Sequence, residues 1–348
     1  MRKLLINGLF FSQKTTGVHR YARELLSELD KIIKKGDISI GVPQNVISPE
    51  YENINKIVIG KHQGLIWEQW DFPKFASKNS FTTVNLCNSQ PLLRPGIICI
   101  HDVAYKTHPE YFKTLHGKLS LIWHKIVYRQ AASFTKYPIL TVSFFSKYSI
   151  IDTYKVHPSR VNVVSNGWQH ITNTEGDDNI LQKQGLAKGD FYFTLGNINY
   201  NKNTKWVIDY AQKHPNDLFV LSGVKVKNSQ VDIEHTPNVR YLGFLSDSEI
   251  VTLYRNCKAF IFPSIHEGFG IPPMEALCHG AQIIIANTTC LPEIYQSSAH
   301  YIDAYDTDVN LDEILSKPVC GAENVLDRYG WDISARKFKM IIDKYVKS

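Results

Sequence analysis

Residues 259–275 read AFIFPSIHEGFGIPPME, and this stretch decides which fold the chain can adopt. The apolar run at its start has the length and composition of a buried β-strand. Two glycines, Gly268 and Gly270, then precede Pro272, which suits the first turn of a helix because proline lacks an N–H that would be unbonded there. The stretch therefore predicts a strand, a glycine turn and a helix in succession, which is the repeating unit of a parallel α/β sheet.

The same turn has the chemistry of an anion site. Unpaired N–H groups and the dipole at a helix N-terminus suit an anion such as a diphosphate, and glycines let a ligand approach the backbone closely. Glu267 lies before the turn and Glu275 near the end of the first helical turn, so both carboxylates could accept hydrogen bonds from sugar hydroxyls in one cleft. The alternative is that Glu275 only complements the helix N-terminus and that Glu267 is a solvated loop residue.

Outward from this stretch, short apolar runs alternate with helical periodicity in both halves of the chain. The strands that this pattern predicts are Lys3–Asn7, Ile38–Val42, Lys56–Ile59, Thr82–Leu86, Gly96–His101, Ile139–Ser143, Val161–Ser165, Phe191–Leu195, Leu218–Leu221, Val239–Leu242, Ala259–Pro263 and Gln282–Ala286. The predicted helices are Gly17–Lys35, Pro109–Phe134, Asn203–His214, Asp247–Cys257, Pro272–His279 and Trp331–Val346. We therefore expect doubly wound, open parallel sheets with helices on both faces.

A polar stretch at residues 167–190, rich in glycine and in Asn or Asp, interrupts the alternation. We place a domain boundary at its start, which gives a first domain at 1–166 and a second at 167–330. The helix predicted near the C-terminus has one apolar face, so we expect residues 331–348 to complete the first domain. Ligands of such sheets bind at the carboxyl ends of the strands, here in the cleft between the domains.

The length of 348 residues exceeds what one hydrophobic core usually holds, and 43% hydrophobic with 21% charged residues is typical of soluble globular domains. Disordered and collagen-like proteins are excluded. No run approaches the roughly twenty apolar residues of a membrane span, and the N-terminal apolar stretch is too short for a signal peptide, so we expect a cytoplasmic protein. The six cysteines have no CxxC pair or nearby histidine spacing, so we expect reduced thiols and no structural metal.

The segments that surround the quoted stretch resemble a known family. Pro263–Glu275, continued to Ala281 and followed by Leu291-Pro292-Glu293, resembles the Glu-x7-Glu signature of retaining GT-B glycosyltransferases, in particular the large family called family 4 or group 1. The likeness extends over nearly the whole chain. The other motifs that carry it are Thr16-Gly17-Val18, His101-Asp102, His108-Pro109-Glu110, Val164-Ser165-Asn166-Gly167 and Lys202-Asn203. The resemblance implies a GT-B fold, in which two Rossmann-like domains face each other across a cleft. Residues 1–166 would then be the acceptor-side domain, and residues 167–330 would be the nucleotide-sugar-binding domain.

The resemblance also implies roles for individual residues. Glu275 would bind the ribose hydroxyls of the nucleotide, and Glu267 would hold hydroxyls of the transferred sugar. Lys202 would contact the donor diphosphate, where stabilising the developing negative charge is usually the largest catalytic effect. The alternative for Lys202 is a solvated lysine at a helix start, although the dipole disfavours a cation there. The remaining residues of the donor-binding turn would be Gly268, Phe269, Gly270 and Ile271.

Three further positions belong to this prediction. His101 ends an apolar strand, and its family counterpart lies beside the donor sugar; the alternative is a structural histidine. Gly17 precedes a long helix, so its backbone could approach a phosphate or the acceptor, or it is an ordinary helix-entry glycine. Family members commonly have an arginine where this chain has Asn197, which can donate a hydrogen bond to the donor but carries no charge. This departure keeps an inactive nucleotide-sugar-binding homologue as an alternative.

The implied reaction moves a glycosyl group from a GDP-, UDP- or dTDP-sugar to a hydroxyl of a glycan acceptor, with retention at the anomeric carbon. The leaving phosphate oxygen would take the acceptor proton, and domain closure would exclude water. We expect no cofactor and no metal ion, because lysine and helix N-termini supply the positive charge.

Two other classes of protein compete with this enzyme. A non-catalytic sugar or nucleotide binding protein on the same scaffold would not turn over the donor. A Rossmann oxidoreductase would need a Gly-x-Gly-x-x-Gly turn after the first strand, where this chain has Asn7-Gly8-Leu9-Phe10-Phe11-Ser12.

The charge of the chain is divided unevenly. Residues 1–165 contain 22 Lys and Arg against 11 Asp and Glu, a balance of +11, while residues 166–348 have a balance of −5. A basic half attracts a phosphorylated ligand, an anionic lipid surface or nucleic acid, although it is also compatible with a solvated basic surface. Because the first half handles the acceptor in this architecture, we expect a lipid-linked acceptor, such as an undecaprenyl-diphosphate-linked glycan of O-antigen or capsule biosynthesis.

Two stretches combine aromatic and basic residues, namely Leu65–Trp70 and Leu121–Arg129. Either stretch could lie at an anionic membrane surface, since amphipathic helices rich in Trp and Lys bind lipid headgroups. Buried helix faces explain them as well, and we favour burial. Nucleic acid is not an expected partner, because no zinc spacing, recognition-helix signature or RNA-binding motif is found.

Overall fold

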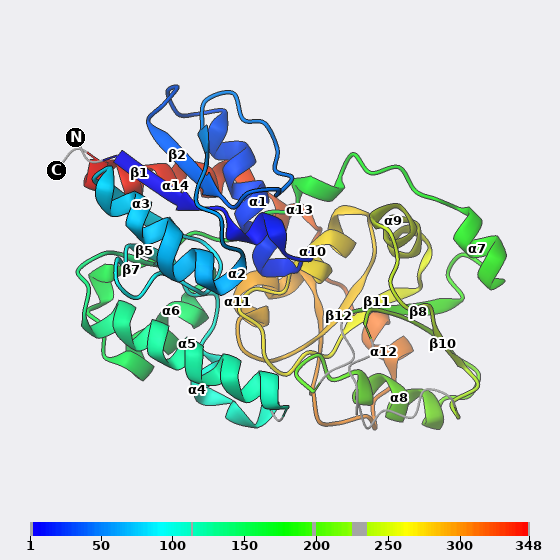
Figure 1. The fold of residues 1–348 in the computed structure, drawn as a ribbon. Coiled ribbons are helices and arrows are strands. Elements are labelled where there is room, and N and C mark those ends of the chain that lie inside the picture. The colour runs from blue at the N-terminus through cyan, green and yellow to red at the C-terminus, as the bar shows by residue number, and fades with distance from the viewer. Residues whose placement is uncertain (1–2, 113, 197–199, 225–234, 347–348) are drawn as a thin grey trace. The chain divides into compact units, whose positions relative to one another are not determined.

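The computed structural model describes residues 3–112, 114–196, 200–224 and 235–346 of the chain (Figure 1). Its contacts divide the chain into two compact units. The first unit is Met1–Gly167 together with Gly330–Ser348, and the second is Trp168–Tyr329. Each unit contains one parallel sheet, so the predicted α/β fold class is confirmed.

The sheet of the first unit has seven parallel strands among the described residues, in the spatial order β3-β2-β1-β4-β5-β6-β7. The strands are β1 (Lys3–Asn7), β2 (Ile38–Val42), β3 (Asn55–Val58), β4 (Phe81–Asn85), β5 (Ile97–Cys99), β6 (Ile139–Thr141) and β7 (Val161–Val163). Strand order reverses between β1 and β4, and the carboxyl ends of such neighbouring strands are where ligands of doubly wound sheets bind.

Helices of the first unit connect these strands and cover the sheet. They are α1 (Gly17–Asp30), α2 (Gly64–Ile66), α3 (Phe72–Lys78), α4 (Ala104–Thr107), α5 (Leu115–Ser133), α6 (Phe144–Tyr154) and α14 (Trp331–Val346). Figure 1 shows α14, in red, beside α1, in blue, although the two helices lie near opposite ends of the chain. The indole of Trp331 contacts the ring of Tyr21 with centroids 6.1 Å apart, so α14 packs as part of the first unit.

The sheet of the second unit has six parallel strands within its described residues, in the order β10-β9-β8-β11-β12-β13. They are β8 (Phe191–Leu195), β9 (Leu218–Ser222), β10 (Val239–Tyr241), β11 (Ala259–Phe262), β12 (Ile283–Ala286) and β13 (His300–Ile302). The helices are α7 (Asn179–Gln184), α8 (Thr204–Lys213), α9 (Asp247–Asn256), α10 (Ile271–Cys278), α11 (Leu291–Tyr295), α12 (Leu311–Ser316) and α13 (Glu323–Leu326). Here the strand order reverses between β8 and β11.

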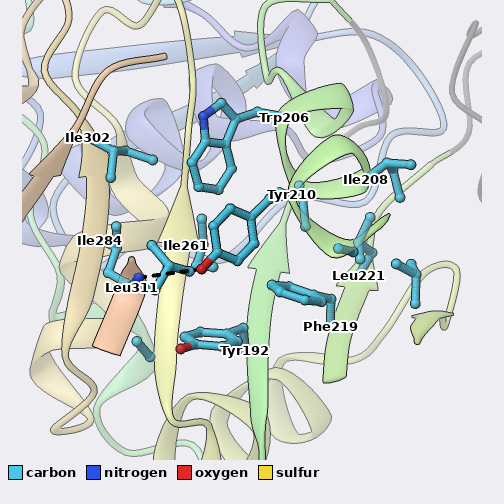
Figure 2. Close-up of a cluster of buried hydrophobic side chains, with 14 residues drawn as sticks. Tyr192, Trp206, Ile208, Tyr210, Phe219, Leu221, Ile261, Ile284, Ile302 and Leu311 are labelled. Atoms are coloured by element: carbon cyan, nitrogen blue, oxygen red, sulfur yellow. Dashed lines mark hydrogen bonds between the residues drawn. The ribbon is translucent and has the colours of Figure 1, made fainter. Parts of the chain in front are cut away.

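An aromatic cluster fixes α8 on the sheet of the second unit (Figure 2). The rings of Trp206 and Tyr210, both on α8, stack with centroids 5.2 Å apart, and Tyr192 of β8 stacks on Phe219 of β9 at the same separation. The hydroxyl of Tyr210 accepts a hydrogen bond from the Leu311 amide at 3.4 Å, the dashed line in Figure 2. Aromatic side chains bury large apolar areas, so this cluster holds the start of α8 in place.

Each predicted element has a counterpart in the structure, and these counterparts differ from the prediction mainly at their ends. The helix predicted at Pro109–Phe134 is divided into a 3-10 turn at Pro109–Tyr111 and α5, because the Thr114 hydroxyl accepts the Gly117 amide and caps a new helix. The helix predicted to reach Lys35 ends at Asp30, whose carboxylate accepts three backbone amides of residues 52–54. Strand β13 was not predicted, and neither were the helices α3, α4, α6, α7, α11, α12 and α13.

No helix among the described residues is long and apolar enough to cross a membrane. All six cysteines have free thiols; Cys99 and Cys290 are buried, and Cys320 is exposed.

Candidate active site

The glycine turn after β11 adopts a geometry that requires glycine. Gly270, which caps α10, has φ +82°, a backbone conformation that side chains rarely adopt. A Cβ atom at this position would lie 2.7 Å from Cδ2 of Leu291. The hydroxyl of Tyr295 donates a hydrogen bond to the Gly270 carbonyl, so α11 also holds the turn. The predicted strand, glycine turn and helix are therefore found, with Pro272 in the first turn of α10.

Lys202 and Glu267 meet beside this turn. Lys202 Nζ lies 2.6 Å from Glu267 Oε1, and the Ser264 hydroxyl donates to the same oxygen at 2.5 Å. The ammonium also lies over the ring of Phe262, 5.1 Å from its centroid. The pair brings a positive and a negative group together at the carboxyl end of β11.

Asn203 explains why Lys202 lies there. It has φ +53° immediately before α8, and its side-chain amide donates to the carbonyls of Pro263 at 3.1 Å and Ala304 at 2.7 Å. These two carbonyls follow β11 and β13, so one side chain ties the start of α8 to two strand ends. The Ser264 hydroxyl and the Ile265 amide both bond the Asn201 carbonyl, at 2.9 and 2.8 Å. The loop with Lys202 is thereby fixed against the loop with Glu267.

Glu275 lies on α10 with its carboxylate largely buried. Its Oε1 lies 2.8 Å from Nε2 of His170, whose side chain is also buried. The Tyr254 hydroxyl donates to Oε2 at 3.2 Å, and burial, followed by the nearby Glu275 charge, raises the pKa of Tyr254 well above its usual value. Carboxylate oxygens are strong hydrogen-bond acceptors, so Glu275 has the chemistry to bind ligand hydroxyls.

His170 and Tyr254 were not among the predicted site residues. His170 falls in the polar stretch that we interpreted as a domain junction, and Tyr254 lies on an amphipathic helix, where a buried tyrosine needs no functional explanation. The spacing of either residue from Glu275 in the sequence carries no signal. Only the packing of the second unit brings these two side chains to the carboxylate.

The side chains of the glycine turn itself point into the core. Phe269 is buried and packs edge-on against Tyr329, with ring centroids 5.4 Å apart, and Ile271 is buried in the first turn of α10. Only the backbone amides of these two residues can serve a ligand. Gly268 lies between Glu267 and Phe269 in the same turn. Asn197 lies outside the described residues.

His101 and Gly17 belong to the first unit. His101 is buried just beyond β5, with Nε2 2.9 Å from the Leu86 carbonyl and its ring edge-on to Tyr21. A carbonyl can only accept, so Nε2 carries the proton and Nδ1 remains an acceptor. Burial lowers the pKa of His101, which favours the neutral ring. Gly17 is the exposed first residue of α1, where Thr16 and His19 pair through the Thr16 amide and hydroxyl and Nδ1 of His19.

The described residues hold no group of three or more His, Cys, Asp or Glu side chains that could bind a metal ion. The positive charge at the candidate site comes from Lys202 and from the N-terminus of α10. Backbone N–H groups of such a terminus carry partial positive charge.

Comparison with known proteins gives this geometry its context. Residues 177–309, which include Lys202, Glu267 and Glu275, match the family of glycosyl transferases group 1. The chain is 23% identical to the O-antigen chain mannosyltransferase RfbU of Salmonella typhimurium, over 94% of this chain and 96% of that protein. It is 27% identical to O-antigen chain mannosyltransferase B of Escherichia coli, over 64% of this chain and 61% of that protein. Residues 177–309 therefore form a glycosyl transferases group 1 domain.

The fold of the chain also matches that of a solved structure. Alr3699/HepE of Anabaena, solved in complex with UDP and glucose, has a TM-score of 0.72 at 15% identity and covers 99% of this chain and 100% of its own. Together with the seven-stranded and six-stranded parallel sheets in the described residues, this likeness shows the GT-B fold that the resemblance implied.

Proposed function

We propose that this protein moves a sugar from a nucleotide-sugar donor to a hydroxyl of a glycan acceptor during O-antigen assembly. The relative RfbU, an O-antigen chain mannosyltransferase, supports this proposal because it aligns over nearly the full length of both chains. A mannosyl donor is therefore the first candidate, with UDP-, GDP- and dTDP-sugars all to be tested.

The observation that carries the proposal is the contact between Lys202 and Glu267 beside the N-terminus of α10. In the proposed complex, Lys202 and the backbone amides of Gly268 to Ile271 bind the donor diphosphate, Glu267 holds the transferred sugar, and Glu275 binds the ribose. Carboxylates suit this work because each accepts strong hydrogen bonds from hydroxyls.

The proposed mechanism proceeds with retention and without a metal ion. The bond that breaks leaves negative charge on a phosphate oxygen, and the Lys202 ammonium together with the amide-rich helix terminus stabilises that charge. The same phosphate oxygen takes the proton of the attacking hydroxyl, so no separate base is needed. Analysis of the product anomer by proton NMR tests retention, and undiminished turnover after chelation with EDTA tests metal independence.

His101, Gly17 and Asn197 keep the roles that the family resemblance implies, as part of the same proposal. The neutral His101 would accept a hydrogen bond from a sugar hydroxyl through its Nδ1. Gly17 would donate its backbone amide to a phosphate or to the acceptor, and Asn197 would donate its side-chain amide to the donor. Because Asn197 replaces a charged residue of many relatives, a nucleotide-sugar-binding homologue with little activity is the second candidate. Release of free nucleotide from the donor in solution separates the two candidates.

Donor binding is tested by a thermal shift screen of UDP-, GDP- and dTDP-sugars. A ligand that binds only the folded state raises the melting temperature. We expect one nucleotide class to do so, Glu275→Ala to abolish that shift, and the exposed control Glu313→Ala to preserve it. An unchanged shift in a folded Glu275→Ala variant would remove this residue from the site.

The acceptor is proposed to be lipid-linked and the enzyme to act at the cytoplasmic membrane surface. Support comes from one face of α5, here called the α5 basic face, on which exposed Ile122 and Ile126 alternate with Lys118, Lys125 and Arg129. Such a face fits anionic lipid headgroups. By contrast, Trp67 is buried and Trp123 packs partly against a core cluster. Flotation with vesicles containing phosphatidylglycerol tests this contact, and Ile122→Ser with Ile126→Ser should weaken it.

A further inference from the structure

A second polar site lies entirely within the first unit. It is a cavity of about 890 Å³ at the carboxyl end of the sheet, beyond β1 and β4. Residues from the start of α1, from the loop after β4 and from α5 surround it. All of its lining residues are described, and none of them is lysine or arginine. The cavity is therefore not basic, although it lies in the half of the chain with a net charge of +11.

Glu68 is the acidic residue of this cavity, and it is only 3% exposed. It lies on the π-helical turn Trp67–Asp71. Its Oε1 accepts a hydrogen bond from the Asn7 side chain at 2.8 Å, and its Oε2 accepts from Ser89 at 2.6 Å and from Gln69 at 3.2 Å. A carboxylate has about four acceptor positions, so three donors leave one for a ligand.

Aromatic side chains form another part of the cavity wall. The Trp123 indole donates to the Ser89 hydroxyl at 3.3 Å, and that hydroxyl in turn donates to Glu68. Tyr105 and His124 stack with centroids 3.8 Å apart and planes inclined by 5°. Flat aromatic surfaces next to a few fixed polar groups are the usual lining of sites for neutral organic ligands.

We propose that this cavity binds a sugar unit of the acceptor, with Glu68 accepting a hydrogen bond from one of its hydroxyls and Trp123 contacting its apolar face. The inference rests on the proposed function and adds which residues of the first unit would contact the acceptor sugar. The absence of lysine and arginine from the described lining assigns the site to an uncharged sugar, not to the diphosphate of a lipid carrier. In this proposal, basic residues elsewhere on the first unit bind the lipid carrier's diphosphate and the anionic membrane surface.

The test uses the full chain and four water-soluble probes, the methyl glycosides of mannose, glucose, galactose and N-acetylglucosamine. Ligand-observed NMR titration measures their dissociation constants with the wild type and with two variants. Glu68→Gln removes the charged acceptor. Leu119→Trp enlarges a side chain that lines the cavity but is 60% exposed, so it adds bulk at the entrance without removing any buried partner.

We expect at least one glycoside to bind the wild type. Glu68→Gln should weaken this binding roughly tenfold, the size of effect that a lost hydrogen bond to a charged group produces. Leu119→Trp should weaken the binding to a similar extent because the larger side chain obstructs the entrance. Leu115→Trp is the matched control, one helical turn earlier on α5, 77% exposed and outside the lining. Equal affinities for all four proteins, or no binding of any probe, would overturn the proposal. Melting temperatures of the free proteins show that Glu68→Gln folds.

The outcome is separable from that of the proposed function. The nucleotide-sugar thermal shift should be the same in wild type, Glu68→Gln and Leu119→Trp, because neither Glu68 nor Leu119 is among the residues assigned to donor binding. A nucleotide-sugar shift without glycoside binding would reject the acceptor cavity alone. Glycoside binding that the variants weaken, without any nucleotide-sugar shift, would reject the donor site and keep the sugar site.

Discussion

Glu275 shows how a carboxylate can be buried and still be kept ready for a ligand. His170 and Tyr254 each contact a different oxygen, so the carboxylate has one orientation before any ligand arrives. A side chain that is already oriented loses less conformational entropy on binding. If Glu275 binds ribose hydroxyls, as proposed, its fixed orientation lowers the entropic cost of donor binding.

Replacing His170 tests the strength of this support. His170→Ala leaves Oε1 of a largely buried carboxylate without its histidine partner, and we expect the free energy of unfolding to fall by about 1–3 kcal/mol. Urea denaturation measures the change. Tyr254→Phe, which removes a longer hydrogen bond from the other oxygen, should cost less. A loss below 0.5 kcal/mol, the ordinary range of surface substitutions, would contradict the assigned contact.

His101 is the residue for which the structure predicts a pH effect. Burial lowers its pKa below the ordinary value of about 6.5, so the unfolded chain binds a proton more readily than the folded chain. The contribution of neutral His101 to stability is therefore present above about pH 6.5 and is lost as the pH falls through the folded pKa. Proton NMR titration of the imidazole should give a midpoint below 6.5, and a midpoint at or above this value would contradict the prediction.

At the scale of single elements, α10 depends on the glycine before it. Gly270→Ala would place a Cβ atom 2.7 Å from Leu291 in a backbone conformation that alanine disfavours. We expect a loss of stability of about 1–3 kcal/mol from the backbone alone, with a further loss from the contact. Because the turn would shift, the thermal shift caused by the nucleotide sugar should also become smaller.

Gly280, just beyond α10, provides the matched control. It has φ +83°, but no atom lies within 4 Å of a Cβ placed there. Gly280→Ala therefore strains the backbone but creates no steric clash. In thermal denaturation it should lower the melting temperature less than Gly270→Ala does. Equal losses in both variants would show that Leu291 moves aside freely.

Most strands, their order and the longer amphipathic helices were predictable because apolar runs and helical periodicity are local signals, whereas helices such as α3, α6 and α7 were not predicted. The ends of elements were harder to predict, because they depend on single hydrogen bonds that periodicity does not record. Examples are the Thr114 hydroxyl that caps α5 and the Asp30 carboxylate that accepts backbone amides at the end of α1. At the candidate site, the pattern around Glu267 indicated the turn, but its contact with Lys202 depends on Asn203 joining two strand ends. The ligand roles of these residues stay predictions.

At the scale of the whole molecule, α14 follows the second unit in sequence but packs in the first. Phe338 of α14 is fully buried, whereas Met340 is largely exposed. We expect Phe338→Ala to destabilise the first unit by about 3–5 kcal/mol and Met340→Ala to have little effect. Hydrogen exchange followed by mass spectrometry locates the loss. Faster exchange confined to residues of the second unit would contradict this assignment of α14.

The place of α14 also has a consequence for biosynthesis. A ribosome makes residues 3–167 first, yet Trp331 and Phe338 emerge only after the whole second unit has been translated. Because domains generally fold as units during synthesis, the second unit can mature on the nascent chain while the first still exposes the surface of α1 that α14 later covers. The first unit, although it is synthesised earlier, would therefore depend for longer on chaperones that protect apolar surfaces of nascent chains.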